Sequence, residues 1–282
     1  MQFKIKTLAL PFLIFASCFN TGAEEQGARG TIIVFGYTKT EIDIAADSRA
    51  ISTNGRPPLD DYCKIVTLDE HSLFTAAGTA IQISSTGRIA WNASVEAVGA
   101  FQQAGTTSDV LLLKRAAKIW AANMVSDINQ SLKIDQTITK RGIEAHNRFL
   151  TGLFMGLEND SVVIYQVELF FDPGTQQAIQ HPSIIPVYST RHYGTLGKNE
   201  IANEILLDQT DFAKVELQKW ISTAPQVPVG DRPVNFAIYL VQITITSHSK
   251  QGDVGGPIDA LIVTKAGTRW VQRKPTCCCQ QK

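Results

Sequence analysis

The chain has 282 residues, of which 44% are hydrophobic and 18% are charged, and its formal net charge is zero. This is the composition of a globular protein with a sizeable core, and it excludes a disordered chain. The balanced charge gives no basis for binding nucleic acid or an anionic membrane surface. The five histidines are scattered without metal-site spacing, so we expect neither a metal nor a cofactor.

Residues 1–23 have the pattern of a secretory signal peptide. Lys4 and Lys6 precede about a dozen apolar residues, and a small-residue site follows, with Thr21 and Ala23 at its small positions. The apolar run is too short for a stable membrane anchor. We therefore expect cleavage after Ala23 and an exported protein, periplasmic or secreted.

A second interpretation concerns Cys18 in the stretch "FASC". This cysteine has the position of the lipid-modified residue of a bacterial lipoprotein, although Phe15 fits that pattern poorly. Lipid on Cys18 would anchor the protein to a membrane, and without it we expect no membrane contact. Both interpretations predict export.

Strands are predicted first along the folded part of the chain. Two almost continuous apolar runs, Thr31–Tyr37 and Ile42–Ala46, indicate strands of a sheet that is covered on both faces. Lys64–Leu68 and Ser72–Gly78 predict a second strand pair around the short turn "DEH".

The spacing then changes to that of helices, over 84–103 and 108–133, with Ser108 as the N-cap of the second helix. Residues 236–249 fit either a helix or a strand. The remaining predictions are strands over 148–157, 161–171 and 183–188, helices over 198–207 and 211–222, a proline-rich loop over 223–233 and a strand hairpin over 257–271.

This order of elements predicts an α+β protein. Two sheets stacked between helical layers, a four-layer αββα sandwich, would satisfy it. No internal repeat or linker divides the chain. We therefore expect a short propeptide over 24–30, one domain over 31–272 and a Cys-rich polar tail over 273–282.

Cysteines are sparse. Cys63 lies beside a predicted strand and is interpreted as a small residue at the edge of the core. The three adjacent cysteines Cys277–Cys279 follow Pro275, and they pair poorly with one another because a disulfide needs a particular Cα separation. We interpret the tail as disordered, with intermolecular disulfides and metal capture as the alternatives.

A nucleophile would form at Thr31 if the chain were cut after Gly30. The new α-amine has an unperturbed pKa of about 7.7–8.0 and can act as general base for the hydroxyl beside it. A nearby lysine would keep the amine neutral and lower the pKa of the hydroxyl, and an acidic residue would fix that lysine. A glycine N–H at a strand end would stabilise the oxyanion. Asp47, Lys64 and Gly78 are the candidates for these roles.

The stretches "GTIIVFGYTKTEIDIAADSRA" and "KIVTLDEHSLFTAAG" resemble the opening of a proteasome β-type subunit, an N-terminal-nucleophile (Ntn) hydrolase. The resemblance implies that a propeptide ending in Gly30 is removed autocatalytically. The loop before the lysine is one residue longer than in the family. The resemblance places Thr31 at the nucleophile position, Asp47 at the acidic position, Arg49 at the arginine of the same motif, Lys64 at the lysine and Gly78 at the oxyanion glycine.

Two later stretches resemble the family with departures. "YGTLG" (193–197) is similar to the glycine–serine segment that supports the nucleophile, with Thr195 where a serine is usual. "GDVGGPIDALIVTKAG" is similar to the late glycine–glycine turn, which an aspartate and a serine normally flank. Gln251 and Val254 occupy those two positions here. Either Asp253 serves through a shifted turn, or this support is missing.

The sequence thus predicts an exported, self-processed threonine-type peptidase or amidohydrolase. A noncatalytic scaffold or binding subunit of the same fold is the first alternative, favoured by Gln251 and Val254. An acylase or amidase acting on small amides is the second. Ring-forming relatives imply a homo-oligomer, but the ATP that drives a gated chamber is not expected outside the cytoplasm.

Overall fold

The structure is a computed structural model and describes residues 31–50, 60, 62–83, 89–105, 111–134, 138, 147–207 and 210–275. These residues form two five-stranded antiparallel sheets, one two-stranded sheet and five α-helices. The predicted α+β class is confirmed. None of the described helices is both long enough and apolar enough to cross a membrane.

The first large sheet consists of β1 (Ile32–Tyr37), β2 (Glu41–Ala46), β10 (His192–Gly197), β11 (Asp259–Thr264) and β12 (Gly267–Gln272). Its strands lie in the order β10-β1-β2-β11-β12. The two predicted hairpins, β1–β2 and β11–β12, are confirmed. β1 and β2 are buried almost throughout, which explains their continuous apolar runs. β10 was not predicted as a strand, because its glycine-rich sequence carries no strand pattern.

The second large sheet consists of β3 (Ile65–Thr67), β4 (Ser72–Gly78), β7 (Arg148–Glu158), β8 (Ser161–Asp172) and β9 (Gln177–Ile184). Its order is β3-β4-β7-β8-β9. The strand predicted over 183–188 is wrong in its bounds, since β9 begins at Gln177. β9 is an edge strand whose side chains are almost all exposed, so it needs no apolar alternation.

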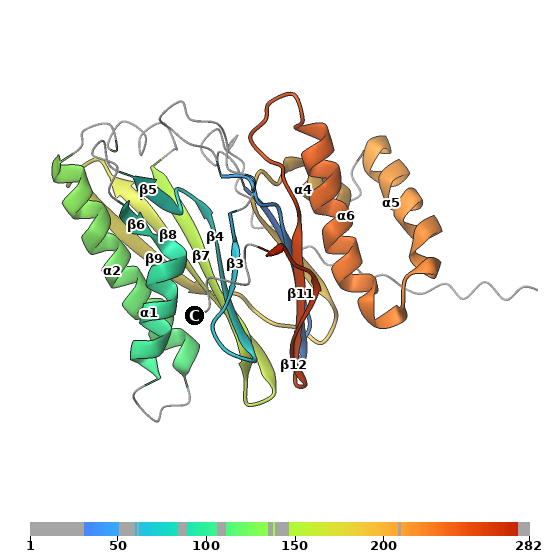
Figure 1. Ribbon diagram of the computed structural model, residues 1–282, viewed down its shortest axis with the longest axis horizontal. Coiled ribbons are helices and arrows are strands. Elements are labelled where there is room, and N and C mark those ends of the chain that lie inside the picture. Colours follow the sequence, from blue (N-terminus) through green and yellow to red (C-terminus); the bar gives the residue numbers. More distant parts are fainter. Residues whose placement is uncertain are drawn as a thin grey trace, which may run out of the picture.

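Two helices pack against the second sheet: α1 (Ala93–Ala104) and α2 (Leu112–Ile134). Figure 1 shows both on the side of that sheet facing away from β11 and β12. Trp120 of α2 lies against Phe74 of β4 and Phe154 of β7, with ring centroids 5.3 and 5.9 Å apart. Its buried indole N–H donates to the carbonyl of Ala93 over 2.9 Å, which ties α2 to the start of α1. Ser108, the predicted N-cap of α2, lies outside the described residues.

The two-stranded sheet consists of β5 (Ile81–Ile83) and β6 (Ile89–Asn92). The first part of the helix predicted over 84–103 is therefore wrong, since α1 begins only at Ala93. The side chain of Asn92 accepts hydrogen bonds from the backbone N–H groups of Ser94 and Val95. This cap sets the start of the helix, and apolar spacing alone does not show it.

Three helices follow in the second half of the chain: α4 (Glu200–Leu207), α5 (Asp211–Thr223) and α6 (Arg232–Ser247). α4 and α6 pack against the first sheet. The loop predicted over 223–233 contains two short 3₁₀ turns, and α6 starts within it, with Pro233 in its first turn. Most of 236–249 is therefore helix.

A third cluster of buried apolar residues joins the two large sheets. Ile33 of β1 packs in it with Leu73 of β4, whereas Ile32 and Val34 belong to the cluster that contains α6. Successive side chains of a strand point to opposite faces, so Thr31 takes the same side as Ile33. Thr31 therefore lies at the edge of the space between the sheets.

Candidate active site

Three predicted site residues lie at strand ends, two from the first sheet and one from the second. Thr31 directly precedes β1, Asp47 directly follows β2 and Lys64 directly precedes β3. All three are buried, with 6%, 1% and 3% of their surfaces exposed. The backbone N–H of Asp47 donates to the carbonyl of Ile32 over 3.1 Å, which closes the end of the β1–β2 pair beside Thr31.

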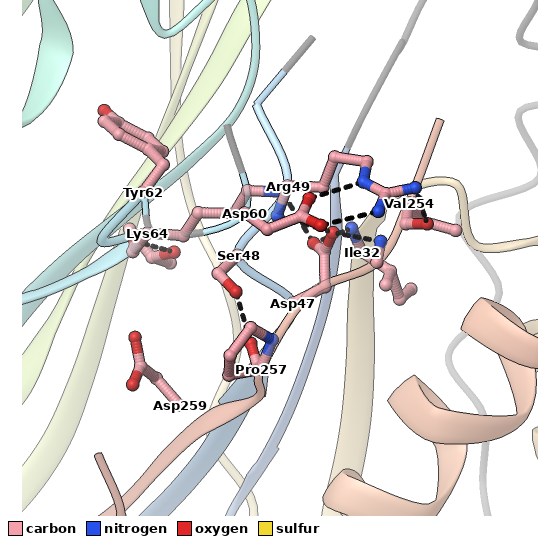
Figure 2. A network of polar contacts seen from close by, with 12 residues as sticks. Ile32, Asp47, Ser48, Arg49, Asp60, Tyr62, Lys64, Val254, Pro257 and Asp259 are labelled. Carbon is pink, nitrogen blue, oxygen red and sulfur yellow. Dashed lines mark hydrogen bonds and ion pairs between the residues drawn. The ribbon is translucent and has the colours of Figure 1, made fainter. Parts of the chain in front are cut away.

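The carboxylate of Asp47 has four partners (Figure 2). One oxygen accepts from Lys64 Nζ at 2.6 Å and from the backbone N–H of Ile32 at 2.9 Å. The other accepts from the backbone N–H groups of Gly255 at 3.0 Å and Arg49 at 3.3 Å. A buried charge needs such partners. Asp47 thus fixes Lys64 relative to Ile32, the residue next to Thr31.

The environment of Lys64 lowers the pKa of its ammonium group. Burial is the largest cause, because it disfavours the charged form. The positive charge of Lys274 acts in the same direction, whereas the charge and hydrogen bond of Asp47 oppose both. The structure therefore holds a lysine with a lowered pKa close to Thr31. The carbonyl of the same lysine accepts a hydrogen bond from the Thr75 hydroxyl at 2.8 Å, which fixes β3 to β4.

A second buried ion pair lies near the first. Lys274 Nζ is 3.0 Å from a carboxylate oxygen of Asp259, and its backbone N–H donates to the other oxygen at 2.8 Å. The same Nζ donates to the carbonyl of Tyr62 at 2.6 Å. Both members of the pair are buried. The fold thus includes Lys274, which the sequence interpretation placed in the polar tail.

Sequence reasoning missed this second pair. Lys274 stands in the polar stretch "QRKP", where a lysine is expected to be solvated. The sequence did indicate that Asp259 would be buried, since this residue stands in the apolar stretch "PIDALIV". A carboxylate buried in such a strand needs a cation or several N–H donors.

Arg49 links the strand ends to the late glycine turn. Its guanidinium binds both carboxylate oxygens of Asp60, at 2.6 and 2.7 Å, and these bonds lower the pKa of that carboxyl. It also donates to the carbonyl of Gly252 at 3.2 Å. The neighbouring Ser48 hydroxyl donates to the carbonyl of Pro257 (Figure 2). These contacts fix residues 252–257 beside Asp47.

Asp253 lies near Thr31 without touching it. The carbonyl of Thr31 accepts a hydrogen bond from the backbone N–H of Lys198 at 2.7 Å, and Lys198 Nζ is 3.5 Å from the Asp253 carboxylate. Gly197, with φ +84°, makes this approach possible, because a Cβ there would lie 2.0 Å from the Thr31 carbonyl oxygen. Among the described residues, Lys198 thus connects Asp253 to Thr31.

Thr195 is directed away from Thr31. It is paired with Val34 across β10 and β1, and its hydroxyl donates to the Asn203 side chain of α4 at 2.7 Å. Val34 faces the helices, so Thr195 lies on the face of the sheet opposite to that of Thr31. The structure does not bring Thr195 into the group around Asp47 and Lys64.

The two residues that depart from the family pattern bring no polar group to Thr31. Val254 is buried in the apolar cluster of α6. Gln251 is exposed, and its side-chain oxygen lies 2.8 Å from the ring Nδ1 of His248.

Gly78 ends β4 at the same end of the second sheet as Lys64, because Ile65 of β3 pairs with Thr75 of β4. Its φ of +105° is in the region that favours glycine, and a Cβ there would lie 2.5 Å from the carbonyl oxygen of Phe149. The position therefore requires glycine for its backbone conformation, whatever its role in chemistry.

Cys63, which directly precedes Lys64, is buried as expected, and it is also disulfide-bonded. Sequence reasoning missed the disulfide because no other cysteine is near Cys63 along the chain. The cleavage position Gly30, the segments 1–23 and 24–30, Cys18 and Cys277–Cys279 lie outside the described residues.

No family model and no curated protein matches the chain. Within the described ranges, no group of three or more His, Cys, Asp or Glu side chains could hold a metal ion.

Proposed function

We propose that the chain is an exported threonine-type peptidase or amidohydrolase that cuts itself between Gly30 and Thr31 and then uses Thr31 as its nucleophile. One observation carries the proposal. The same Asp47 oxygen accepts hydrogen bonds from Lys64 Nζ and from the backbone N–H of Ile32, the residue after Thr31. The ammonium group that would activate Thr31 is therefore held beside the adjacent residue of the chain.

The fold supports the same proposal. The two large sheets share one apolar cluster, and each has a further cluster with its own helices. We propose that this arrangement is the four-layer αββα sandwich of the proteasome-like Ntn hydrolases. The strand positions of Thr31, Asp47 and Lys64 agree with that family's order of nucleophile, acid and lysine.

Self-cleavage and catalysis would use the same hydroxyl. In the precursor the Thr31 oxygen attacks the carbonyl of Gly30, the acyl group passes from nitrogen to oxygen, and water hydrolyses the resulting ester. The freed α-amine then serves as general base toward the substrate, while the charge of Lys64 keeps that amine neutral. The backbone N–H of Gly78 is the proposed oxyanion donor, whose loss typically costs about 2.7–4 kcal/mol.

Two observations support export. The first residues have the signal-peptide pattern, and Cys63 is disulfide-bonded. Disulfides form and persist in oxidising compartments outside the cytosol.

A noncatalytic scaffold of the same fold is a second candidate. Val254 offers no hydroxyl, Thr195 binds Asn203, and Asp253 is engaged with Lys198. A site that lacks these supports for Thr31 would keep the fold while losing the chemistry.

An activity screen distinguishes the candidates. Wild-type protein and the variants Thr31→Ala and Thr31→Ser are incubated with a peptide library and with a library of small acyl amides. We expect wild-type protein to cleave peptides, and the serine variant to retain measurable activity because it keeps a hydroxyl. The alanine variant should lose at least about 10³-fold, because removing a catalytic nucleophile costs that much or more. Cleavage of small amides alone would indicate an acylase. Cleavage of neither library would favour the scaffold, and equal activity of the alanine variant would contradict the role of Thr31.

A further inference from the structure

The disulfide of Cys63 has a partner beyond the described residues. The chain contains five cysteines, and the other four are Cys18 and Cys277–Cys279. Cys63 itself is 2% exposed, so its partner must come from a segment that reaches the interior of the fold at this point.

The end of the described chain lies at that point. Lys274 is fixed by two bonds to Asp259, and its Nζ donates to the carbonyl of Tyr62, the residue before Cys63. An extended chain spans at most about 3.3–3.6 Å per residue, so Cys277 can lie up to roughly 10 Å from Lys274. A disulfide needs Cα atoms about 4.4–6.8 Å apart, which is within this reach.

Cys18 is the poorer partner. It belongs to the segment 1–23 that is predicted to be removed on export. The tail cysteines, in contrast, follow a buried anchor within a few residues. Such anchoring gives them a high effective concentration at Cys63, which also favours them over a cysteine of another molecule.

We infer that Cys63 is joined by a disulfide to one of the tail cysteines Cys277–Cys279, and that this bond ties the C-terminus to the strand that begins at Lys64. Two thiols lose two protons and two electrons to form the S–S bond. The oxidant is a disulfide-bearing thiol oxidoreductase of the oxidising compartment, whose own disulfide is reduced to two thiols.

The disulfide requires no catalytic activity of the chain. The disulfide would hold Lys274 on Tyr62 and Asp259, so it would stabilise the second buried ion pair. It would also give a partner to one of the three adjacent cysteines, which pair poorly with one another.

Peptide mapping without reduction tests the inference. Trypsin cuts after Arg49, Lys64 and Arg273, so Cys63 lies in the peptide 50–64 and the tail cysteines in 274–282. We expect these two peptides to be joined by a bond that disappears on reduction, and to come from monomers on a non-reducing gel. Cys18→Ser is the matched control and should leave the joined pair unchanged. A joined pair of 50–64 with the Cys18 peptide, a link between two molecules, or a free Cys63 thiol would overturn the inference.

A variant with all three tail cysteines changed to serine provides the second test, without disturbing the core. We expect one thiol at Cys63 that reacts only after unfolding, and a melting temperature lower by roughly 5–10 °C than that of the wild-type protein. Reductant should lower the melting temperature of the wild-type protein by a similar amount and leave the variant unchanged. If reductant lowers both equally, or if Cys63 stays oxidised in the variant, the tail is not its partner.

Discussion

Asp47–Lys64 and Asp259–Lys274 are buried ion pairs made of the same residue types, with Nζ to oxygen distances of 2.6 and 3.0 Å. Each carboxylate also accepts backbone N–H bonds. The two pairs differ in which residues donate those backbone N–H groups. Asp47 binds the N–H of Ile32, beside Thr31, whereas Asp259 binds the N–H of Lys274 itself.

This comparison separates structure from chemistry. A buried lysine–aspartate pair is not in itself a sign of catalysis, because the second pair holds the C-terminal segment to the carbonyl of Tyr62. The first pair is a candidate for catalysis because of its position beside a hydroxyl residue. The second pair also acts on the first, since the charge of Lys274 contributes to lowering the pKa of Lys64.

The largest expected difference concerns self-cleavage. We expect Lys64→Met to slow cleavage between Gly30 and Thr31 by about 10²–10³-fold, the usual cost of removing one preorganised electrostatic group, whereas folded Lys274→Met should cleave within a few fold of the wild-type rate. Intact mass recorded over time on purified precursor gives both rates. Equal slowing in the two variants would show that the pairs act only through structure.

The second prediction concerns stability. Lys274→Met leaves the charge of Asp259 buried without its cation and should lower the free energy of unfolding by about 3–5 kcal/mol. Replacing both members, as Asp259→Leu with Lys274→Met, should cost much less, because no uncompensated charge remains. Urea unfolding of the two variants and the wild-type protein measures the difference. A double variant less stable than the single one would contradict this account.

The third prediction concerns pH. Burial lowers the pKa of Lys64 below the 10.5 of the unfolded chain, so between these two values the unfolded state binds more protons. The contribution of Lys64 to the free energy of unfolding is therefore constant below this window and rises with pH inside it, by at most about 1.4 kcal/mol per pH unit. The stability difference between wild type and Lys64→Met, measured by urea unfolding from about pH 7 to about pH 10.5, should grow in favour of the wild type. A difference that shrinks over this range would show that the pKa is not lowered.

The smallest effect is expected at Arg49 and Asp60. This pair is partly exposed, so solvent screens it and Asp60→Asn should cost about 0.2–1 kcal/mol. The self-cleavage rate should change little, since Asp47 keeps its bond to Lys64. If Asp60→Asn lowered the free energy of unfolding by several kcal/mol, this ion pair would stabilise the fold as strongly as a buried pair.

The elements that the sequence predicted well are those whose burial follows a simple period. β4 has the predicted bounds, β1 and β2 differ from prediction by one residue each, and the apolar stripe of α2 through Trp120 is buried. β9 was predicted with the wrong bounds and β10 was missed, because an exposed edge strand and a glycine-rich strand have no apolar alternation. The predicted start of α1 was too early, because the true start depends on the hydrogen bonds that the Asn92 side chain accepts.

The candidate site divides in a similar way. The contact between Asp47 and Lys64 could be expected, because both lie in opening stretches whose resemblance to one family stays in register. The partners of Asp259 and Cys63 could not, since they depend on where the C-terminal segment returns to the fold. The face that the Thr195 hydroxyl takes could not be predicted either, because strand pairing, rather than sequence spacing, decides it.

The N-terminus of the mature protein tests the central claim most directly. Intact mass and N-terminal sequence are determined for wild-type protein from the exported fraction, beside Thr31→Ala. We predict that the wild-type chain begins at Thr31 and that the variant begins near Glu24. Two chains that share a start upstream of residue 31 would contradict the claim that Thr31 is a nucleophile.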